Sequence, residues 1–180
     1  MKGLIFTEFL DYVDRNLDPE VADRLAAAGH DRYQPGANYD DQRLHGLLTQ
    51  TASLAGVPVD ELLRRFGTQL FGRFAALYPV FIADADSAVA FLSKINTRVH
   101  GELNKLYDEV QFPVFACRQL EGGDFEMTYH SHRHLADLAE GLLRGCIGHF
   151  GEPIDVRRED LPASDGRQVV RFTLVASSRH

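Results

Sequence analysis

The residues best suited to chemistry in this chain are one histidine and a short string of alternating polar side chains. His100 lies on or beside the apolar face of a predicted helical region, and a neutral imidazole is a common metal ligand. Tyr129, Ser131 and Arg133 occupy alternate positions and offer two hydroxyls and a guanidinium. On an extended segment these three side chains point to the same side. Together they form a donor set suited to paired carboxylates.

These two features together match the requirements of an iron porphyrin, which needs an axial ligand for its iron and partners for two propionates. Each charge-assisted hydrogen bond to a propionate contributes about 1.5–3 kcal/mol. Each feature also has a plain structural interpretation. His100 alone is compatible with a core histidine bonded to the backbone, and the triplet alone with an exposed polar edge strand. Haem binding is therefore a hypothesis that the rest of the sequence must support.

A rival metal site uses the other face of the same string. His130, His132 and His134 also alternate, and three imidazoles on one strand face can bind zinc or copper. No acidic or cysteine fourth ligand is obvious nearby, and the three side chains are equally compatible with a solvated face. A zinc-binding structural module therefore stays open as an alternative.

Composition and charge exclude several classes of protein. The chain has 180 residues, of which 44% are hydrophobic and 25% charged, enough for one domain with a sizeable core. A net charge of −7 gives no basic surface for nucleic acid or an anionic membrane. No stretch approaches the roughly 20 apolar residues of a membrane span. The cysteines, Cys117 and Cys146, fit a reduced cytoplasmic protein. No phosphate loop, nucleophile elbow or carboxylate pair stands out, so no enzyme activity is predicted.

The periodicity of apolar residues predicts an α+β fold. Helical spacing covers residues 5–17, 19–28, 44–55 and 60–78, and a further helical region with caps for a break near 96–97 covers 86–107. After Pro113 the pattern predicts strands at 112–120 and 124–131, a helix at 135–150 and a second strand pair at 153–158 and 168–176. We expect one domain over residues 1–180.

These motifs resemble the H-NOX family, the haem nitric oxide/oxygen-binding domains, which are bacterial gas sensors related to the haem region of soluble guanylate cyclase. The resemblance covers nearly the whole chain. It rests on residues 1–10, 99–107 and 112–115 and on the Tyr129-x-Ser131-x-Arg133 motif. It implies a helical N-terminal part and a C-terminal antiparallel sheet with a packed helix, with haem b (iron protoporphyrin IX) buried between them.

The resemblance also implies a role for each matching residue. His100 corresponds to the proximal ligand of the haem iron. Tyr129, Ser131 and Arg133 correspond to the propionate-binding triplet, and Pro113 to the proline that presses on the haem and distorts it. The positions that correspond to the distal pocket, where the gas binds, are Ile5, Phe9, Leu138 and Leu142.

Selectivity among gases is implied by the distal side. Family members that bind oxygen stably use a distal tyrosine, and Leu138 occupies the matching position. Leucine cannot donate a hydrogen bond to bound oxygen, so we expect a sensor of nitric oxide, and also of carbon monoxide, that excludes oxygen. A tyrosine from elsewhere, Tyr78 or Tyr107, would change this expectation if it reached the pocket.

The mechanism implied by the resemblance is a switch in which nitric oxide releases His100. The sensor fold fills the chain, so we expect a partner in trans, a histidine kinase or a cyclic-di-GMP enzyme. A gas-binding haem carrier without a signalling role is the alternative beside the zinc module.

Overall fold

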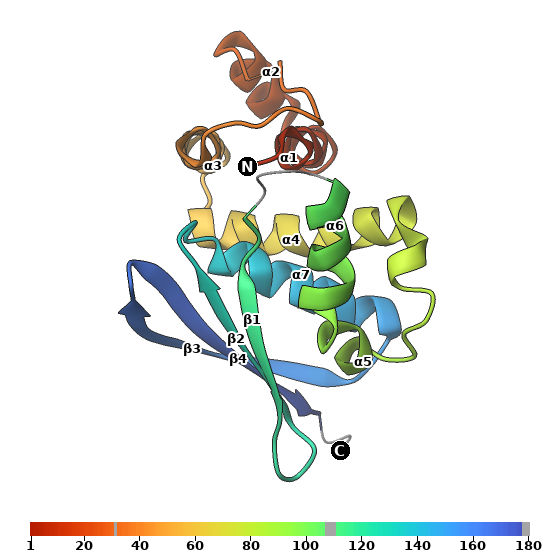
Figure 1. Cartoon of the computed structure of the whole chain (residues 1–180). Coiled ribbons are helices and arrows are strands. Elements are labelled where there is room, and N and C mark those ends of the chain that lie inside the picture. Colours follow the sequence, from red (N-terminus) through yellow and green to blue (C-terminus); the bar gives the residue numbers. More distant parts are fainter. Residues whose placement is uncertain (31, 107–110, 178–180) are drawn as a thin grey trace.

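The computed structural model describes residues 1–30, 32–106 and 111–177 and has the predicted α+β architecture (Figure 1). A helical part precedes a sheet, and one long helix that follows the second strand packs against the sheet. The first helices are α1 (Gly3–Asn16), α2 (Pro19–Ala27), α3 (Asp41–Ala55) and α4 (Val59–Leu77). Their apolar faces meet in one core built around Phe6, Phe9, Leu47 and Phe66. None of the helices in the described ranges is long and apolar enough to span a membrane.

The centre of the molecule is the crossing of α4 with α7 (Ala136–Phe150). Glycines bring the two backbones into direct contact there. A Cβ added to Gly141 would lie 2.3 Å from the carbonyl oxygen of Arg64, and a Cβ on Gly67 would lie 2.5 Å from that of Leu138. On the next turn of α7, Gly145 meets α4 in the same way. Any side chain larger than hydrogen at these positions would force the helices apart.

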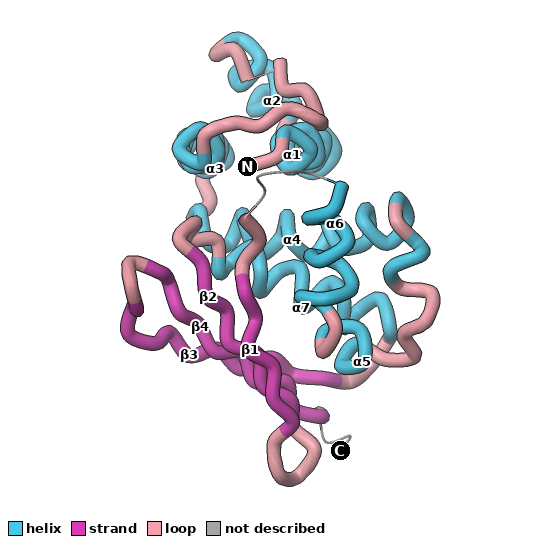
Figure 2. Tube along the Cα trace, in the orientation of Figure 1, coloured by secondary structure: helices cyan, strands magenta, loops and turns pink. Residues whose placement is uncertain are grey.

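The sheet is four-stranded and antiparallel, in the order β1-β2-β4-β3 (Figure 2). Its strands are β1 (Val114–Gln119), β2 (Phe125–Ser131), β3 (Ile154–Ser164) and β4 (Arg167–Ala176). Alternate residues of β2 are buried, and they pack with β4 residues against α7. The other face carries a row of opposite charges across all four strands, formed by Arg118, Glu126, Arg171 and Glu159.

One strand of the sheet is longer than predicted, and the extended segment expected to carry the polar triplet is shorter. β3 runs to Ser164 instead of residue 158, and it includes Pro162. Proline is tolerated there because β3 is an edge strand, where a missing N–H costs no ladder bond; the pairing also shifts register between Leu161 and Ser164. β2 ends at Ser131, as predicted. Arg133 therefore lies in the turn after the strand, and the triplet is not carried by one extended segment as expected.

The segment that carries His100 is divided more finely than predicted. After α4 comes a short 3₁₀ turn, η1 (Pro79–Phe81), and then α5 (Ala88–Leu92), a π-helical turn η2 (Ile95–His100) and α6 (Gly101–Leu106). The helix breaks at residues 93–94, slightly before the predicted position. A π-helical turn contains one more residue than an α-helical turn and is frequent at functional sites.

Candidate functional site

A cavity of about 270 Å³ lies between the helical part and the sheet. Its walls come from α1, α4, the η1–α6 segment, α7 and the first two strands. Most of the lining is apolar, and it includes Leu4, Phe71, Phe74, Phe91, Met127 and Leu143. Such a mainly apolar chamber with a few polar groups is typical of a binding site for an organic cofactor.

His100 lines this cavity from η2. Its ring stacks on Phe112, with centroids 4.6 Å apart and planes within 13°. Burial lowers its pKa to about 4, although the backbone of Pro113 raises it in part. The imidazole is therefore neutral near pH 7, which is the form that ligates metals. Its Nδ1 atom is enclosed and lacks a hydrogen bond of good geometry.

Tyr129, Ser131 and Arg133 line the same cavity from the end of β2 and the following turn. Burial raises the pKa of Tyr129, so its phenol stays protonated and able to donate. Its hydroxyl oxygen accepts from the backbone N–H of Leu135 at 3.2 Å, and the Ser131 hydroxyl oxygen accepts from the backbone N–H of Arg133 at 3.1 Å. These bonds hold both hydroxyls in place.

Arg133 is anchored by α3 and by the segment that leads into β1. Its Nε donates to a carboxylate oxygen of Asp41 at 2.9 Å, and its Nη1 donates to the carbonyl oxygen of Gln111. Burial alone would raise the pKa of Asp41, but hydrogen bonds from Arg133 and from the N-terminal ammonium bring it below its usual value. The carboxylate is therefore charged at neutral pH and orients the guanidinium beside the cavity.

The residues predicted for the distal pocket do not all reach the cavity. Ile5, Leu138 and Leu142 line it. Phe9 does not: it is fully buried in the helical core, where it packs edge-to-face on Phe66 with centroids 5.1 Å apart. Pro113 also lines the cavity, beside His100.

Tyr78 is a lining residue that the resemblance did not assign. It lies just after α4, where its ring meets Phe74 and Phe81. The other tyrosine considered for this role, Tyr107, lies outside the described residues. The phenol of Tyr78 is thus a polar group on a wall that is otherwise largely apolar.

The histidine-rich string does not form the rival metal site. The strand ends before His132, and His134 has a left-handed backbone with φ of 54°. His132 instead accepts a hydrogen bond from Arg167 at 3.1 Å. Among the described residues, no group of three or more histidine, cysteine or acidic side chains could hold a metal ion. The alternating pattern failed because the extended backbone stops at Ser131.

The observed site fits a haem. An enclosed neutral imidazole stands in an apolar cavity, and a hydroxyl–hydroxyl–guanidinium set lines the same cavity from the sheet side. The imidazole could supply an axial ligand, and the second set could supply partners for carboxylates.

Comparison with known proteins gives the same assignment. The family model described as Haem-NO-binding (HNOB) matches residues 2–158. A mutant of the Fe(II) unliganded H-NOX protein from K. algicida is 26% identical, with a TM-score of 0.88 over 99% of this chain and 97% of that one. An H-NOX protein from S. oneidensis in the Fe(II)NO state is 25% identical, with a TM-score of 0.83 over 97% and 99%. A mutant H-NOX protein of T. tengcongensis is 25% identical, with a TM-score of 0.87 over 97% and 96%. Comparison with curated proteins found no significant match.

Proposed function

Because the chain belongs to the Haem-NO-binding family, we propose that it is a haem-based nitric oxide sensor that regulates a separate signalling protein. The observation that carries the proposal is that His100 and the Tyr129, Ser131 and Arg133 triplet line one apolar cavity. His100 would hold the iron of haem b, and the triplet would hold the propionates. A bound haem supplies an iron that takes up a diatomic gas.

The surroundings of His100 support its role as a releasable ligand. The imidazole is neutral and is flanked by Phe112 and, at 6.2 Å between ring centroids, by Phe115. The turn that carries it, η2, contains no fully buried residue, so little apolar contact opposes a shift of this turn. Nitric oxide would release His100, and the freed turn and Pro113 would relax together. A partner that prefers the relaxed state would then read the change.

Selectivity for nitric oxide over oxygen follows from the distal wall. Leu138 and Leu142 present only hydrocarbon to the cavity, and a hydrocarbon wall cannot donate a hydrogen bond to bound oxygen. Carbon monoxide would bind for the same reason as nitric oxide, since neither gas depends on such a donor.

The decisive experiment is an absorption spectrum of the reduced, haem-loaded protein without gas, in air and with nitric oxide. We expect a five-coordinate ferrous spectrum that air leaves unchanged and that nitric oxide converts to a five-coordinate nitrosyl. Failure to take up haem would refute the proposal. His100→Gly with free imidazole supplies the second test, because an untethered ligand cannot move η2. If this variant signalled like the wild type, release of His100 would not be the switch.

Tyr78 favours a second candidate, a haem protein that carries oxygen. Its phenol belongs to the cavity wall, and a phenol can donate to bound oxygen. A stable oxy spectrum in the wild type that is lost in Tyr78→Phe would establish oxygen binding and displace nitric oxide selectivity. An air-stable ferrous spectrum in both proteins would eliminate the carrier.

For the signalling partner, we propose a histidine kinase or a cyclic-di-GMP enzyme in the cytoplasm. The protein would act as a non-catalytic sensor domain spanning residues 1–180. Kinase or cyclic-di-GMP turnover measured with purified candidates, with and without nitric oxide, would test this assignment. No response by either class to the nitric oxide-bound protein would contradict it.

A further inference from the structure

The turn that carries His100 is attached to the rest of the protein mainly by polar side chains. η2 has no fully buried residue, whereas six residues of α4 and seven of α7 are buried. Its aliphatic contacts come from Ile95 and Val99, both only partly buried, and the ring of His100 adds its stacking on Phe112. A segment with so little burial depends on hydrogen bonds for its position.

Asn96 makes the first of these attachments, to the edge of the sheet. Its side-chain Nδ2 donates to the carbonyl oxygen of Phe115 at 2.6 Å, and the backbone N–H of Phe115 donates to its Oδ1 at 3.1 Å. β1 is an edge strand, so these backbone groups have no neighbouring strand to pair with. The amide of Asn96 thus takes the place of a neighbouring strand at one residue.

Phe115, the residue that Asn96 binds, also lies beside the imidazole of His100. The ring of Phe115 lies 6.2 Å from that of His100 and 5.7 Å from that of Tyr129. By fixing the backbone of Phe115 to η2, Asn96 fixes the distance between the histidine and the strand end that carries the propionate triplet.

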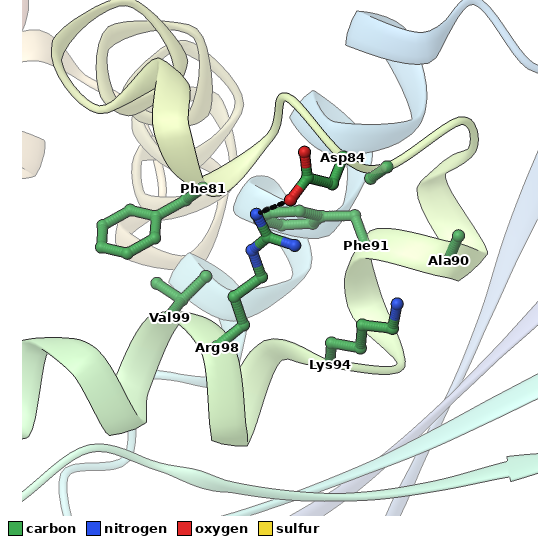
Figure 3. Close-up of a pocket in the computed structure, with 8 residues that line it drawn as sticks. Phe81, Asp84, Ala90, Phe91, Lys94, Arg98 and Val99 are labelled. Atoms are coloured by element: carbon green, nitrogen blue, oxygen red, sulfur yellow. Dashed lines mark hydrogen bonds and ion pairs between the residues drawn. The ribbon is translucent and has the colours of Figure 1, made fainter.

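Arg98 makes the second attachment, toward η1. Its Nη2 donates to Asp84 at 2.5 Å and to the carbonyl oxygen of Val80 at 3.2 Å. Figure 3 shows Arg98 extending from its helix past Phe91 to Asp84. Asp84 is 71% exposed, so salt weakens the ion pair. The bonds of Asn96 join neutral groups and do not share that sensitivity.

We propose that Asn96 and Arg98 are positioning residues that bracket the turn carrying His100 and set how readily His100 is released. The inference rests on the proposed function. Asn96 restrains η2 against β1, Arg98 restrains it against η1, and His100 lies at the end of the bracketed turn. Loosening either side lowers the barrier to displacement of the histidine.

The test compares Asn96→Ala and Arg98→Met with a control, Glu102→Gln. Glu102 pairs with Lys105 at 2.6 Å on α6, directly after His100, and both side chains are exposed. Haem-loaded proteins are mixed with nitric oxide, and the conversion of the six-coordinate to the five-coordinate nitrosyl is followed by stopped-flow absorption. We expect about a fivefold faster conversion in Asn96→Ala, equivalent to about 1 kcal/mol, and no change in Glu102→Gln.

Two further measurements distinguish the attachment made by Asn96 from the one made by Arg98. Raising the salt concentration should accelerate conversion in Asn96→Ala, where only the Arg98 arm remains, and should have little effect in Arg98→Met. Amide hydrogen exchange at Phe115, measured by NMR on the reduced protein, should speed up in Asn96→Ala and stay unchanged in Arg98→Met.

The outcomes distinguish this inference from the proposed function. If the wild type shows no histidine-ligated ferrous spectrum, the proposed function itself fails. If the wild type is normal but both bracket variants convert at the wild-type rate, the bracket is wrong and His100 ligation stands. Equal acceleration in Glu102→Gln would also overturn the bracket, because any loosening of the segment would then suffice.

Discussion

Replacing Gly141 by alanine should destabilise the protein by driving α4 and α7 apart. The added Cβ would lie 2.3 Å from the carbonyl oxygen of Arg64 and 2.9 Å from the Cα of Gly67. Both atoms belong to the backbone, so no side chain can rotate away. To reach 3.4 Å, the near limit of ordinary van der Waals contact, the helices must separate by about 1 Å, which forfeits about a quarter to a half of each contact's dispersion energy.

The size of the effect follows from two opposing contributions. Overpacking costs about 1–3 kcal/mol, and rigid backbone contacts place this site at the upper end. Alanine regains about 1 kcal/mol of helix propensity over glycine. We therefore expect a net loss of about 2 kcal/mol, seen as a fall in Tm of about 4–8 °C for a chain of this length.

Gly148 on the same helix provides the matched control. A Cβ there would meet nothing within 4 Å. Gly148→Ala should therefore gain the higher helix propensity of alanine without a steric clash and raise Tm by about 2–4 °C. Urea unfolding followed by circular dichroism measures both variants, and unchanged slopes would show that the denatured states are comparable. If Gly141→Ala proved as stable as Gly148→Ala, the close backbone contact between α4 and α7 would be refuted.

Three other outcomes are expected. Burial raises the pKa of Cys146 to about 12 and raises that of Cys117 as well; at pH 8 a thiol reagent should label Cys117 slowly and Cys146 only after unfolding, as mass spectrometry would show. Ser87 caps α5 by accepting from the N–H of Ala90 at 3.1 Å, so Ser87→Ala should cost about 1 kcal/mol in urea unfolding, and an unchanged midpoint would contradict the cap. With free haem at 100 times its Kd, the free energy of unfolding should be about 2.7 kcal/mol higher than that of the haem-free protein. Equal Tm values with and without haem would argue against the site.

Helix and strand assignments were predictable where one face of an element is buried. The alternation along β2 and the apolar stripe of α4 follow directly from burial, and the predicted α+β class and family are confirmed. The full length of β3 was not predictable, because a proline usually ends a strand. Pro162 is tolerated only because the topology places β3 at an edge of the sheet. The roles of Gly67 and Gly141 also depend on which helix faces them, and a single sequence does not show this.

The site was predictable to the extent that its residues stand in compact motifs. Tyr129, Ser131 and Arg133 lie close together in the chain, and the structure places all three on the cavity with His100. Phe9 shares a helical stripe with Ile5, but only Ile5 reaches the cavity, because α1 turns Phe9 toward Phe66. Whether a residue on a helix faces the cavity depends on the rotation of that helix about its axis, and the periodicity of apolar residues fixes this rotation only roughly.

Asn96 was recognisable only as a helix cap. Its side chain instead bonds to the backbone of Phe115, nineteen residues further along the chain. No local signal distinguishes an asparagine that caps its own helix from one that bonds to a distant strand edge, so this contact required the folded chain.

The same contact covers part of an exposed strand edge. Exposed strand edges are templates on which other chains add strands and aggregate. On β1 the amide of Asn96 occupies the backbone groups of Phe115 that an incoming strand would need. At the opposite edge, Pro162 offers no N–H to an incoming strand, and the shift of register beside it makes the edge of β3 irregular. Removing the amide would therefore leave the backbone groups of Phe115 unpaired at the edge of the sheet. Asn96→Ala should form fibrillar or amorphous aggregates at a lower protein concentration than the wild type.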